Sequence, residues 1–305
     1  MPEMTLGHGW NGRGPAGRIA YVDGRYLPHG RAAVHIEDRG LQLADAVYEV
    51  CGVVAGALMD EQEHLDRLAR SLGEIGMAMP MARGALRLVM RELVRRNRVR
   101  NGLLYLQVTR GAARRDHPIP PAGRRPTLIL TVREMDVGAI ERRRVSGVAV
   151  VTRADERWAR CDIKSTQLLP NLLAKTAARQ MGAYEAWLVD ADGFVTEGSS
   201  TTAWIVDQAE TLTTRQLSHK ILPGVTRRVI LEAAAEAQLP VLEHSFTPAE
   251  AQAAKEAFIS SATGIVPVVS IDGKTIGDGR PGPVTRRVQE LYAHHSAARA
   301  AQASR

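Results

Sequence analysis

Segments typical of strands and of helices occur in two series, and this arrangement constrains the fold most strongly. In the first series, an apolar hairpin at 19–27 and strands at 103–109 and 127–132 flank amphipathic helical segments. A polar, charge-rich stretch follows at 135–144, and beyond it strands and helices alternate. Each series is long enough to bury a core of its own. We therefore predict a two-domain α+β protein with domains at 18–135 and 144–295, a linker at 136–143, and flexible ends at 1–17 and 296–305.

Local signals support several of these elements. Asp23-Gly24 and Asp192-Gly193 are two-residue turn signals typical of hairpins. Leucines recur at spacings of three and four residues within 61–77, which predicts an amphipathic helix. Thr247-Pro248-Ala249-Glu250 combines a capping box with a proline in the first turn, and therefore marks the start of a helix.

Charge and composition exclude several classes of protein. The net charge of +7 comes from dispersed arginines and aromatic residues make up only 4%, so a nucleic-acid-binding surface is not predicted. Two cysteines are too few for a disulfide framework or a cysteine-based zinc site, and the nine histidines lack metal-ligand spacing. No apolar run approaches the roughly 18 residues of a membrane span, and residues 1–17 lack the apolar core of a signal peptide. We expect a cytoplasmic protein that binds no metal, membrane or nucleic acid.

A single lysine, Lys164, stands out between the apolar strand at 148–152 and the helix at 168–181. It lies near arginines in the segment 156–165, at the start of an apolar face. A partly desolvated amine on a rigid element is suited to form and exchange Schiff bases. The alternative is an ordinary lysine at the boundary of two elements, with its charged end in solvent.

Two later segments favour the chemical interpretation. Residues 195–202 read Val-Thr-Glu-Gly-Ser-Ser-Thr-Thr, and residues 221–227 read Ile-Leu-Pro-Gly-Val-Thr-Arg. The three segments in this order resemble the fold-type IV family of pyridoxal-phosphate enzymes, the branched-chain aminotransferase-like proteins, and within it the D-amino acid transaminases. The resemblance extends from about residue 21 to residue 292. It implies a smaller N-terminal α/β sandwich, a larger C-terminal α/β pseudo-barrel, and pyridoxal 5′-phosphate as cofactor.

The resemblance assigns the reacting end of the cofactor to two residues. Lys164 matches the lysine that forms the Schiff base and then moves a proton between the substrate α-carbon and the C4′ carbon of the cofactor. Glu197 matches the carboxylate that pairs with the pyridine nitrogen and favours its protonated form. An exposed glutamate after a strand is the alternative for Glu197, and the Gly-Ser-Ser-Thr run that follows favours the functional interpretation.

Three segments match the phosphate-binding parts of the family. Gly224, Val225 and Thr226 open a helix, where free backbone N–H groups and the helix dipole favour an anion. Arg67 matches an arginine that reaches the phosphate from the other domain. A weaker match is the loop of Ser261, Ala262 and Thr263, in which Ala262 stands where a hydroxyl residue is common.

The resemblance implies that four residues bind the substrate: Tyr48, Tyr105, Arg115 and His117. The last three match positions that contact the substrate carboxylate, partly across a dimer interface. A guanidinium can hold a carboxylate through two hydrogen bonds. A basic surface loop is the alternative, since 110–125 is long for a connection between strands.

Three further residues depart from the family pattern. Asp116 lies beside Arg115, so its carboxylate would offset part of the arginine charge. Thr202 and Trp204 stand in a segment where the family often has Asn and Phe, and Trp204 either reshapes the pocket or packs in the core. We make no prediction of the effect of these residues on substrate choice.

These features predict a homodimeric, pyridoxal-phosphate-dependent transaminase. It would exchange an amino group between D-amino acids, such as D-alanine and D-glutamate, and 2-oxo acids by a ping-pong mechanism. Branched-chain L-amino acid transaminases, aminodeoxychorismate lyase and (R)-amine transaminases share the lysine, glutamate and phosphate segments and are the alternatives. The loop with Arg115 and His117 favours the D-amino acid enzyme. Retention of Lys164 argues against a non-catalytic binding protein on the same fold.

Overall fold

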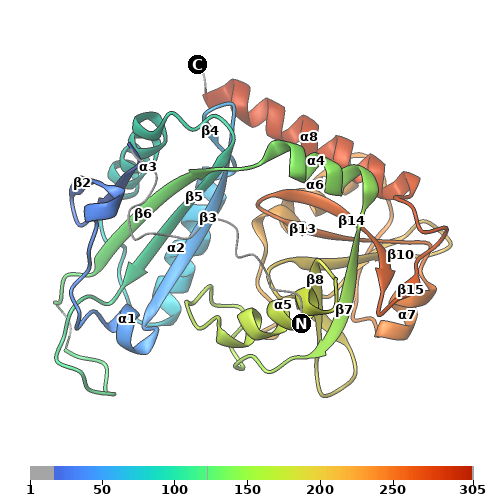
Figure 1. The fold of residues 1–305 in the computed structure, drawn as a ribbon, viewed down its shortest axis with the longest axis horizontal. Coiled ribbons are helices and arrows are strands. Elements are labelled where there is room, and N and C mark those ends of the chain that lie inside the picture. The colour runs from blue at the N-terminus through green and yellow to red at the C-terminus, as the bar shows by residue number, and fades with distance from the viewer. Residues whose placement is uncertain (1–16, 122, 304–305) are drawn as a thin grey trace, which may run out of the picture.

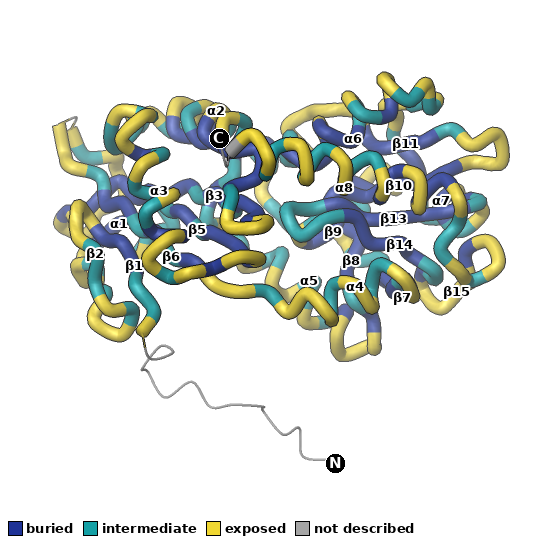
Figure 2. The backbone as a smooth tube through the Cα atoms, turned by 90° about the horizontal axis from the view of Figure 1, so that it is seen from above, coloured by how far each residue is buried: buried dark blue, intermediate teal, exposed yellow. Residues whose placement is uncertain are grey.

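The structure of the protein is a computed structural model that describes residues 17–121 and 123–303. Two β-sheets organise these residues, the first built from strands within 19–134 and the second from strands within 148–275 (Figure 1). Buried backbone is concentrated in the strands of both sheets (Figure 2). The expected flexible segment at 1–17 lies, except for its last residue, outside the described residues.

The first sheet has six strands in the order β2-β1-β6-β5-β3-β4, and all neighbouring pairs are antiparallel. Asp23 and Gly24 connect the first two strands with φ values of 46° and 91°, as a tight hairpin turn requires. The hairpin predicted at 19–27 and the strands predicted at 103–109 and 127–132 are therefore confirmed. The six strands are β1 (Ile19–Val22), β2 (Arg25–Pro28), β3 (Ala46–Val54), β4 (Ala57–Leu58), β5 (Gly102–Thr109) and β6 (Thr127–Glu134).

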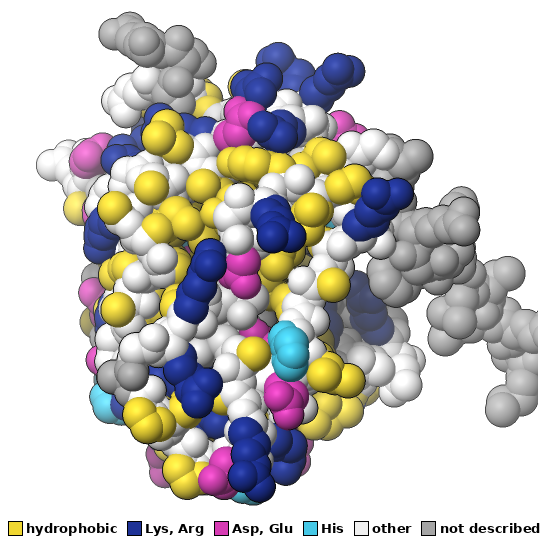
Figure 3. All heavy atoms as spheres, turned by 90° about the vertical axis from the view of Figure 1, so that its left-hand side faces the viewer, with side chains coloured by type: hydrophobic (Ala, Val, Ile, Leu, Met, Phe, Trp, Pro, Cys, Tyr) yellow, Lys and Arg dark blue, Asp and Glu magenta, His cyan; other side chains and the backbone are white. Residues whose placement is uncertain are grey.

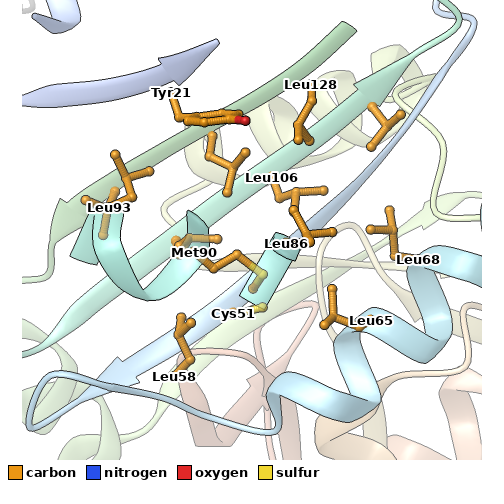
Figure 4. Close-up of a cluster of buried hydrophobic side chains, with 14 of the residues drawn as sticks. Tyr21, Cys51, Leu58, Leu65, Leu68, Leu86, Met90, Leu93, Leu106 and Leu128 are labelled. Carbon is orange, nitrogen blue, oxygen red and sulfur yellow. The ribbon is translucent and has the colours of Figure 1, made fainter. Parts of the chain in front are cut away.

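Two helices, α2 (Glu61–Glu74) and α3 (Arg83–Asn97), pack on this sheet. Their leucines and methionines point toward side chains of the strands, such as Leu106 and Leu128 (Figure 4). Fully burying one such side chain stabilises the fold by about 1.5–3 kcal/mol. This core holds α2 in place, and α2 carries Arg67. Two short helical segments, the 3-10 helix His29–Arg31 and α1 (Arg39–Leu43), precede β3.

The second sheet has nine strands in the order β12-β11-β10-β13-β14-β7-β8-β9, with β15 paired to β14. Three neighbouring pairs are parallel: β14 with β7, β7 with β8, and β11 with β12. The strands are β7 (Val148–Ala154), β8 (Glu185–Val189), β9 (Val195–Gly198), β10 (Thr202–Val206), β11 (Leu212–Thr214), β12 (Val241–Glu243), β13 (Glu256–Ser261), β14 (Gly264–Ile271) and β15 (Lys274–Thr275).

The second sheet curls into a partial barrel. Strand β9 forms one edge, yet it also contacts β10 near the other edge. Apolar side chains from six of the strands meet in one buried cluster that includes Trp187 and Ile259. Its helices are α5 (Leu169–Gln180), α6 (Val225–Glu236), α7 (Pro248–Ala253) and α8 (Pro283–Ala303). The predicted fold class, with a smaller first unit and a larger curled second unit, is confirmed.

The polar stretch between the two sheets is helical. Residues 136–143, the predicted linker, belong to helix α4 (Val137–Ser146) apart from the residue that caps it. Asp136 caps the helix by accepting a hydrogen bond from Ala139 N at 2.8 Å. The capped segment contains Ala, Glu and Arg, which favour helix. The domain boundaries themselves stay a prediction.

The C-terminal segment is helical up to residue 303. We predicted a flexible end at 296–305, and α8 extends through most of these residues, so their flexibility stays a prediction. Arg299 connects this part of α8 to the first unit, because its guanidinium binds Glu63 on α2 at 2.7 Å. Residues 304 and 305 lie outside the described residues.

The surface carries charge of both signs. On the face shown in Figure 3, Lys and Arg side chains are spread over the surface, with Asp and Glu side chains between them. Within 17–121 and 123–303, no helix has both the length and the apolar composition needed to cross a membrane.

Candidate active site

A cavity of about 430 Å³ lies between the two sheets and is lined by residues from both. Tyr48 on β3 and Arg67 on α2 line it from the first unit. Lys164 and Glu197 line it from the second unit, together with both predicted phosphate segments. Of the residues predicted from the sequence, the structure thus brings together Tyr48, Arg67, Lys164, Glu197, Val225, Thr226, Ser261, Ala262 and Thr263.

Lys164 lies on the segment that connects β7 to α5, and the first unit holds this segment in place. Its carbonyl oxygen accepts a hydrogen bond from Tyr48 N at 2.9 Å, and its own N–H donates to Ser71 Oγ at 3.3 Å. The neighbouring Asp162 is buried and accepts from Arg70 Nη2 at 2.6 Å. The Lys164 backbone is therefore fixed by α2 and β3, although no local helix or strand contains it.

The Lys164 amine is directed into the cavity. Its Nζ lies 4.2 Å from the centre of the Tyr48 ring, a cation–π contact. No residue in the described part of the chain forms a hydrogen bond or an ion pair with this amine. It is therefore available to react with a ligand in the cavity.

Glu197 is the third of the four residues of β9, and its carboxylate lies in the same cavity. Leu222 N donates to it at 3.3 Å, and Arg157 Nη1 donates to Oε1. Burial raises the pKa of the Glu197 carboxyl, while the charge and the hydrogen bond of Arg157 oppose that rise. The next residue must be glycine, because a Cβ on Gly198 would lie 2.1 Å from Thr201 Oγ1.

Arg157 is a site residue to which sequence reasoning assigned no role. It also donates to Asp155 Oδ1 at 2.8 Å, to Thr196 Oγ1 at 3.2 Å and to the Lys220 carbonyl oxygen at 3.1 Å. These contacts fix the guanidinium against Glu197. Forty residues separate the two in sequence, so only the pairing of β7, β8 and β9 reveals that they meet.

Glu185 is a second residue that the sequence did not reveal. It is fully buried on β8 and accepts hydrogen bonds from the hydroxyls of the Gly-Ser-Ser-Thr run: Ser199, Ser200 and Thr201. Lys175 on α5 neutralises its charge at 3.0 Å. The three hydroxyl residues that follow Gly198 therefore all bind one buried carboxylate, and these hydrogen bonds keep the turn after β9 in one conformation.

The part of the cavity lined by the start of α6 can bind an anion. Helix α6 begins at Val225, and Gly224 before it supplies no side chain to cap the helix. The first backbone N–H groups of α6 are therefore without a side-chain cap, and the residues that carry them line the cavity. Ser261 Oγ and Thr263 Oγ1 lie 2.8 Å apart on the opposite loop. A helix N-terminus, hydroxyls and the Arg67 guanidinium are donors suited to a phosphate. With Lys164 and Glu197, the donor set fits pyridoxal phosphate.

Arg67 is held by a buried carboxylate on β3. Its Nε and Nη2 donate to Glu49 at 2.8 and 2.7 Å, and Nη1 donates to the Pro223 carbonyl oxygen at 3.1 Å. His64 Nδ1 lies 2.7 Å from the same Glu49 carboxylate. Burial alone would raise the Glu49 pKa, but the charge and hydrogen bonds of Arg67, followed by those of His64, lower it to about 2.

We expect this network to make stability depend on pH. The Glu49 pKa is about 2 in the folded protein and 4.5 in its ordinary state, so the network stabilises the fold above about pH 4.5 and loses this contribution as the pH falls toward 2. The free energy of unfolding of the cofactor-free protein should fall by about 2 kcal/mol between about pH 5 and pH 3 from this group. Urea denaturation of wild type and Glu49→Gln measures the difference.

Glu290 on α8 provides the control, since it forms an exposed pair with Arg287 at 3.5 Å. Glu290→Gln should keep the wild-type pH dependence, because exposed pairs contribute little. An equally steep decline in Glu49→Gln and in the wild type would contradict the role assigned to Glu49.

The predicted substrate residues divide into two groups. Tyr48 lines the cavity and stacks on Tyr105, with ring centres 5.7 Å apart. Tyr105 lies outside the lining, donates from its hydroxyl to Gln107 Oε1 at 2.7 Å, and has its pKa raised to about 12 by burial. Arg115 and His117 are exposed on the loop after β5 and do not line the cavity of their own chain.

The departures from the family pattern also have defined surroundings. Asp116 Oδ1 accepts from His117 N at 2.8 Å, and no ion pair with Arg115 occurs in the described residues. Trp204 is buried, stacks on Phe258 with ring centres 5.3 Å apart, and donates to Ser260 Oγ at 2.9 Å. Trp204 therefore packs in the core behind the site, whereas Thr202 lines the cavity directly.

The fold is similar to that of solved aminotransferases. A branched-chain amino acid aminotransferase from Escherichia coli superposes with a TM-score of 0.83 and 24% identity, over 91% of this chain and 94% of that one. A branched-chain amino acid aminotransferase from T.th., complexed with N-(5′-phosphopyridoxyl)-L-glutamate, gives a TM-score of 0.82 and 25% identity, over 93% of this chain and 95% of that one.

Sequence comparison specifies the family. The model of amino-transferase class IV matches residues 46–271, so the chain belongs to this family. The D-alanine aminotransferase of Bacillus licheniformis is 41% identical over 268 residues, which cover 88% of this chain and 93% of that protein. The D-alanine aminotransferase of Listeria innocua is 38% identical over 272 residues, 89% of this chain and 93% of that protein.

Proposed function

We propose that the protein is a pyridoxal-phosphate-dependent transaminase that exchanges an amino group between D-amino acids and 2-oxo acids. The observation that carries this proposal is the common cavity of the Lys164 amine and the Glu197 carboxylate, which the start of α6 also lines. The relatives named D-alanine aminotransferase, at 35–41% identity over most of the chain, support the D-amino acid substrates.

Each residue has a separate task in this reaction. Bound pyridoxal phosphate supplies the electron sink that makes the substrate α-proton removable. The Lys164 amine attaches the cofactor and, once released, carries a proton to and from the substrate α-carbon. The Glu197 carboxylate, aimed by Arg157, holds a proton at the ring nitrogen. Arg67 and the N–H groups at the start of α6 hold the phosphate.

Substrate selection in this proposal needs a second copy of the chain. Arg115 and His117 are exposed and lie outside the cavity of their own chain. Exposed leucines on α5, at 169, 172 and 173, offer an apolar surface near α1, where Thr166 Oγ1 binds the Ala44 carbonyl oxygen at 3.2 Å. Pairing two copies would cover these leucines and bring the loop at 110–125 to the neighbouring cavity. A homodimer is therefore part of the proposal. The cytoplasmic location stays a prediction from the sequence.

A substrate comparison tests this function. Wild type should convert D-alanine much faster than L-leucine. Arg115→Leu should lower kcat/KM for D-alanine by roughly 10- to 150-fold, the equivalent of a charge-assisted contact worth about 1.5–3 kcal/mol. A simple (R)-amine lacks the carboxylate and should lose little. Arg114→Leu, in the same loop, is the matched control. Preference for L-leucine would favour the branched-chain alternative, to which the solved structures named above are similar in fold.

Mixing an inactive variant, Lys164→Ala, with an impaired one, Arg115→Leu, tests the contribution of the second copy. A Lys164→Ala subunit retains Arg115, and an Arg115→Leu subunit retains Lys164. If Arg115 acts across the interface, the mixed dimer contains one intact site, and mixing should restore activity toward D-alanine. If Arg115 acts within its own chain, no mixed dimer contains an intact site, and mixing should restore nothing.

A further inference from the structure

The start of α2 is fastened to the last turns of α8. Asp60 directly precedes α2 in a left-handed conformation, with φ 48° and ψ 39°, and its side chain does not cap the helix. The buried carboxylate binds His295 Nε2 at 2.6 Å, and Arg299 Nε lies 3.5 Å from the same oxygen. The position of α2 therefore depends on α8, because its own preceding residue is engaged there.

A second carboxylate connects α2 to both C-terminal helices. Glu63, in the first turn of α2, binds Arg299 Nη2 at 2.7 Å. The same Glu63 oxygen lies 3.1 Å from Arg228 Nη2, in the first turn of α6. Helices α2, α6 and α8 therefore meet around Asp60 and Glu63. Both carboxylates lie largely out of solvent, where ion pairs are screened less than on the surface.

The other end of α8 is fixed in the second unit. Val284 N and Thr285 N donate to the two oxygens of Glu256 on β13 at 3.0 and 2.7 Å. Gln289 Nε2 donates to the Ile265 carbonyl oxygen at 3.1 Å. A helix of 21 residues is about 30 Å long, and α8 extends from the second sheet to β4 of the first (Figure 1). Helix α8 therefore contacts both units and connects them.

The middle of α8 lies beside the phosphate end of the cavity. Burial and the charge of Asp60 raise the pKa of the Tyr292 hydroxyl, while its hydrogen bond with Thr226 acts in the opposite direction. Tyr292 therefore contacts Thr226, in the first turn of α6. One helix thus contacts both parts that would hold a phosphate: the start of α6 directly, and α2 through its first turn.

We propose that α8 clamps α2 against the start of α6, with His295 and Arg299 as positioning residues that set the affinity for the phosphate of the cofactor. The proposal rests on the function proposed above, in which Arg67 and α6 bind that phosphate. Arg67 lies two turns after Asp60 on α2, and its Nη1 already reaches the Pro223 carbonyl oxygen just before α6. Without the clamp, α2 and Arg67 can shift away from α6.

The test compares the double variant His295→Ala/Arg299→Ala with wild type. In cofactor-free protein, dissociation constants for pyridoxal phosphate and for inorganic phosphate should both rise roughly tenfold, the scale expected from losing charged contacts. At saturating cofactor, kcat should stay within about twofold, because neither side chain lines the cavity. Arg287→Ala, on the same helix in an exposed pair, is the control and should bind like wild type.

Two further measurements separate the possible outcomes. Urea denaturation reports whether the double variant is merely less stable, and lower stability with unchanged dissociation constants would overturn the clamp. The single variant Arg299→Lys retains the positive charge. It should bind pyridoxal phosphate and inorganic phosphate more tightly than the double variant does. If wild type itself binds no pyridoxal phosphate, the proposed function fails. If wild type and the double variant bind it equally, the clamp alone fails.

Discussion

Replacing Lys164 by Ala should lower transamination by roughly 10²–10⁴-fold or more, the contribution of a positioned acid–base group. The amine can act as nucleophile and as proton carrier, and an alanine supplies neither function. Borohydride treatment of wild-type protein loaded with pyridoxal phosphate should fix the cofactor to the peptide that contains Lys164. Mass spectrometry should find no such modification in Lys164→Ala.

Two variants accompany this measurement. Lys164→Arg retains the positive charge but should be as inactive as Lys164→Ala, because the task requires a nucleophilic amine and not a charge alone. Lys220→Ala removes a partly exposed lysine that pairs with Asp190 and Asp192, and should stay active. A fully active Lys164→Ala protein would refute the assignment.

Glu197→Gln should slow the reaction by roughly 10- to 150-fold. The change keeps the shape of the side chain but removes the charge that favours a protonated ring nitrogen, and a charge-assisted hydrogen bond is worth about 1.5–3 kcal/mol. Arg157 adds to the effect, since its guanidinium would then face a neutral amide in a buried site. Single-turnover kinetics with D-alanine should show the loss in the proton-transfer step.

Thermal unfolding of cofactor-free Glu197→Gln should show that the fold is retained. Wild-type rates in this variant would mean that another group faces the ring nitrogen. A loss that appears only in KM, with kcat unchanged, would also contradict the proposed task, because the carboxylate is expected to act on the reacting state and not on substrate binding.

Much of the fold could be predicted from local signals. The Asp23-Gly24 turn, the leucine periodicity of α2 and the capping box before α7 involve residues within a few positions of one another, and each is confirmed. The helical form of 137–146 was not predicted, because a charge-rich composition is compatible with both linkers and exposed helices. The continuation of α8 to residue 303 was not predicted either, because its contacts there are with Asp60 and Glu63, more than 200 residues earlier.

Residue types and local backbone were enough to identify the groups available at the candidate site. These are the lysine between a strand and a helix, the glutamate in a strand, and the glycine before α6, because each is recognised from its neighbours in the sequence. Which of these groups meet depends on the tertiary structure. Arg157 faces Glu197 because β7 lies beside β8 and β8 beside β9, and Arg67 reaches the segment before α6 because Glu49 and α8 hold α2 there. Contacts between distant residues follow from how strands pair and helices pack, and no local pattern encodes them.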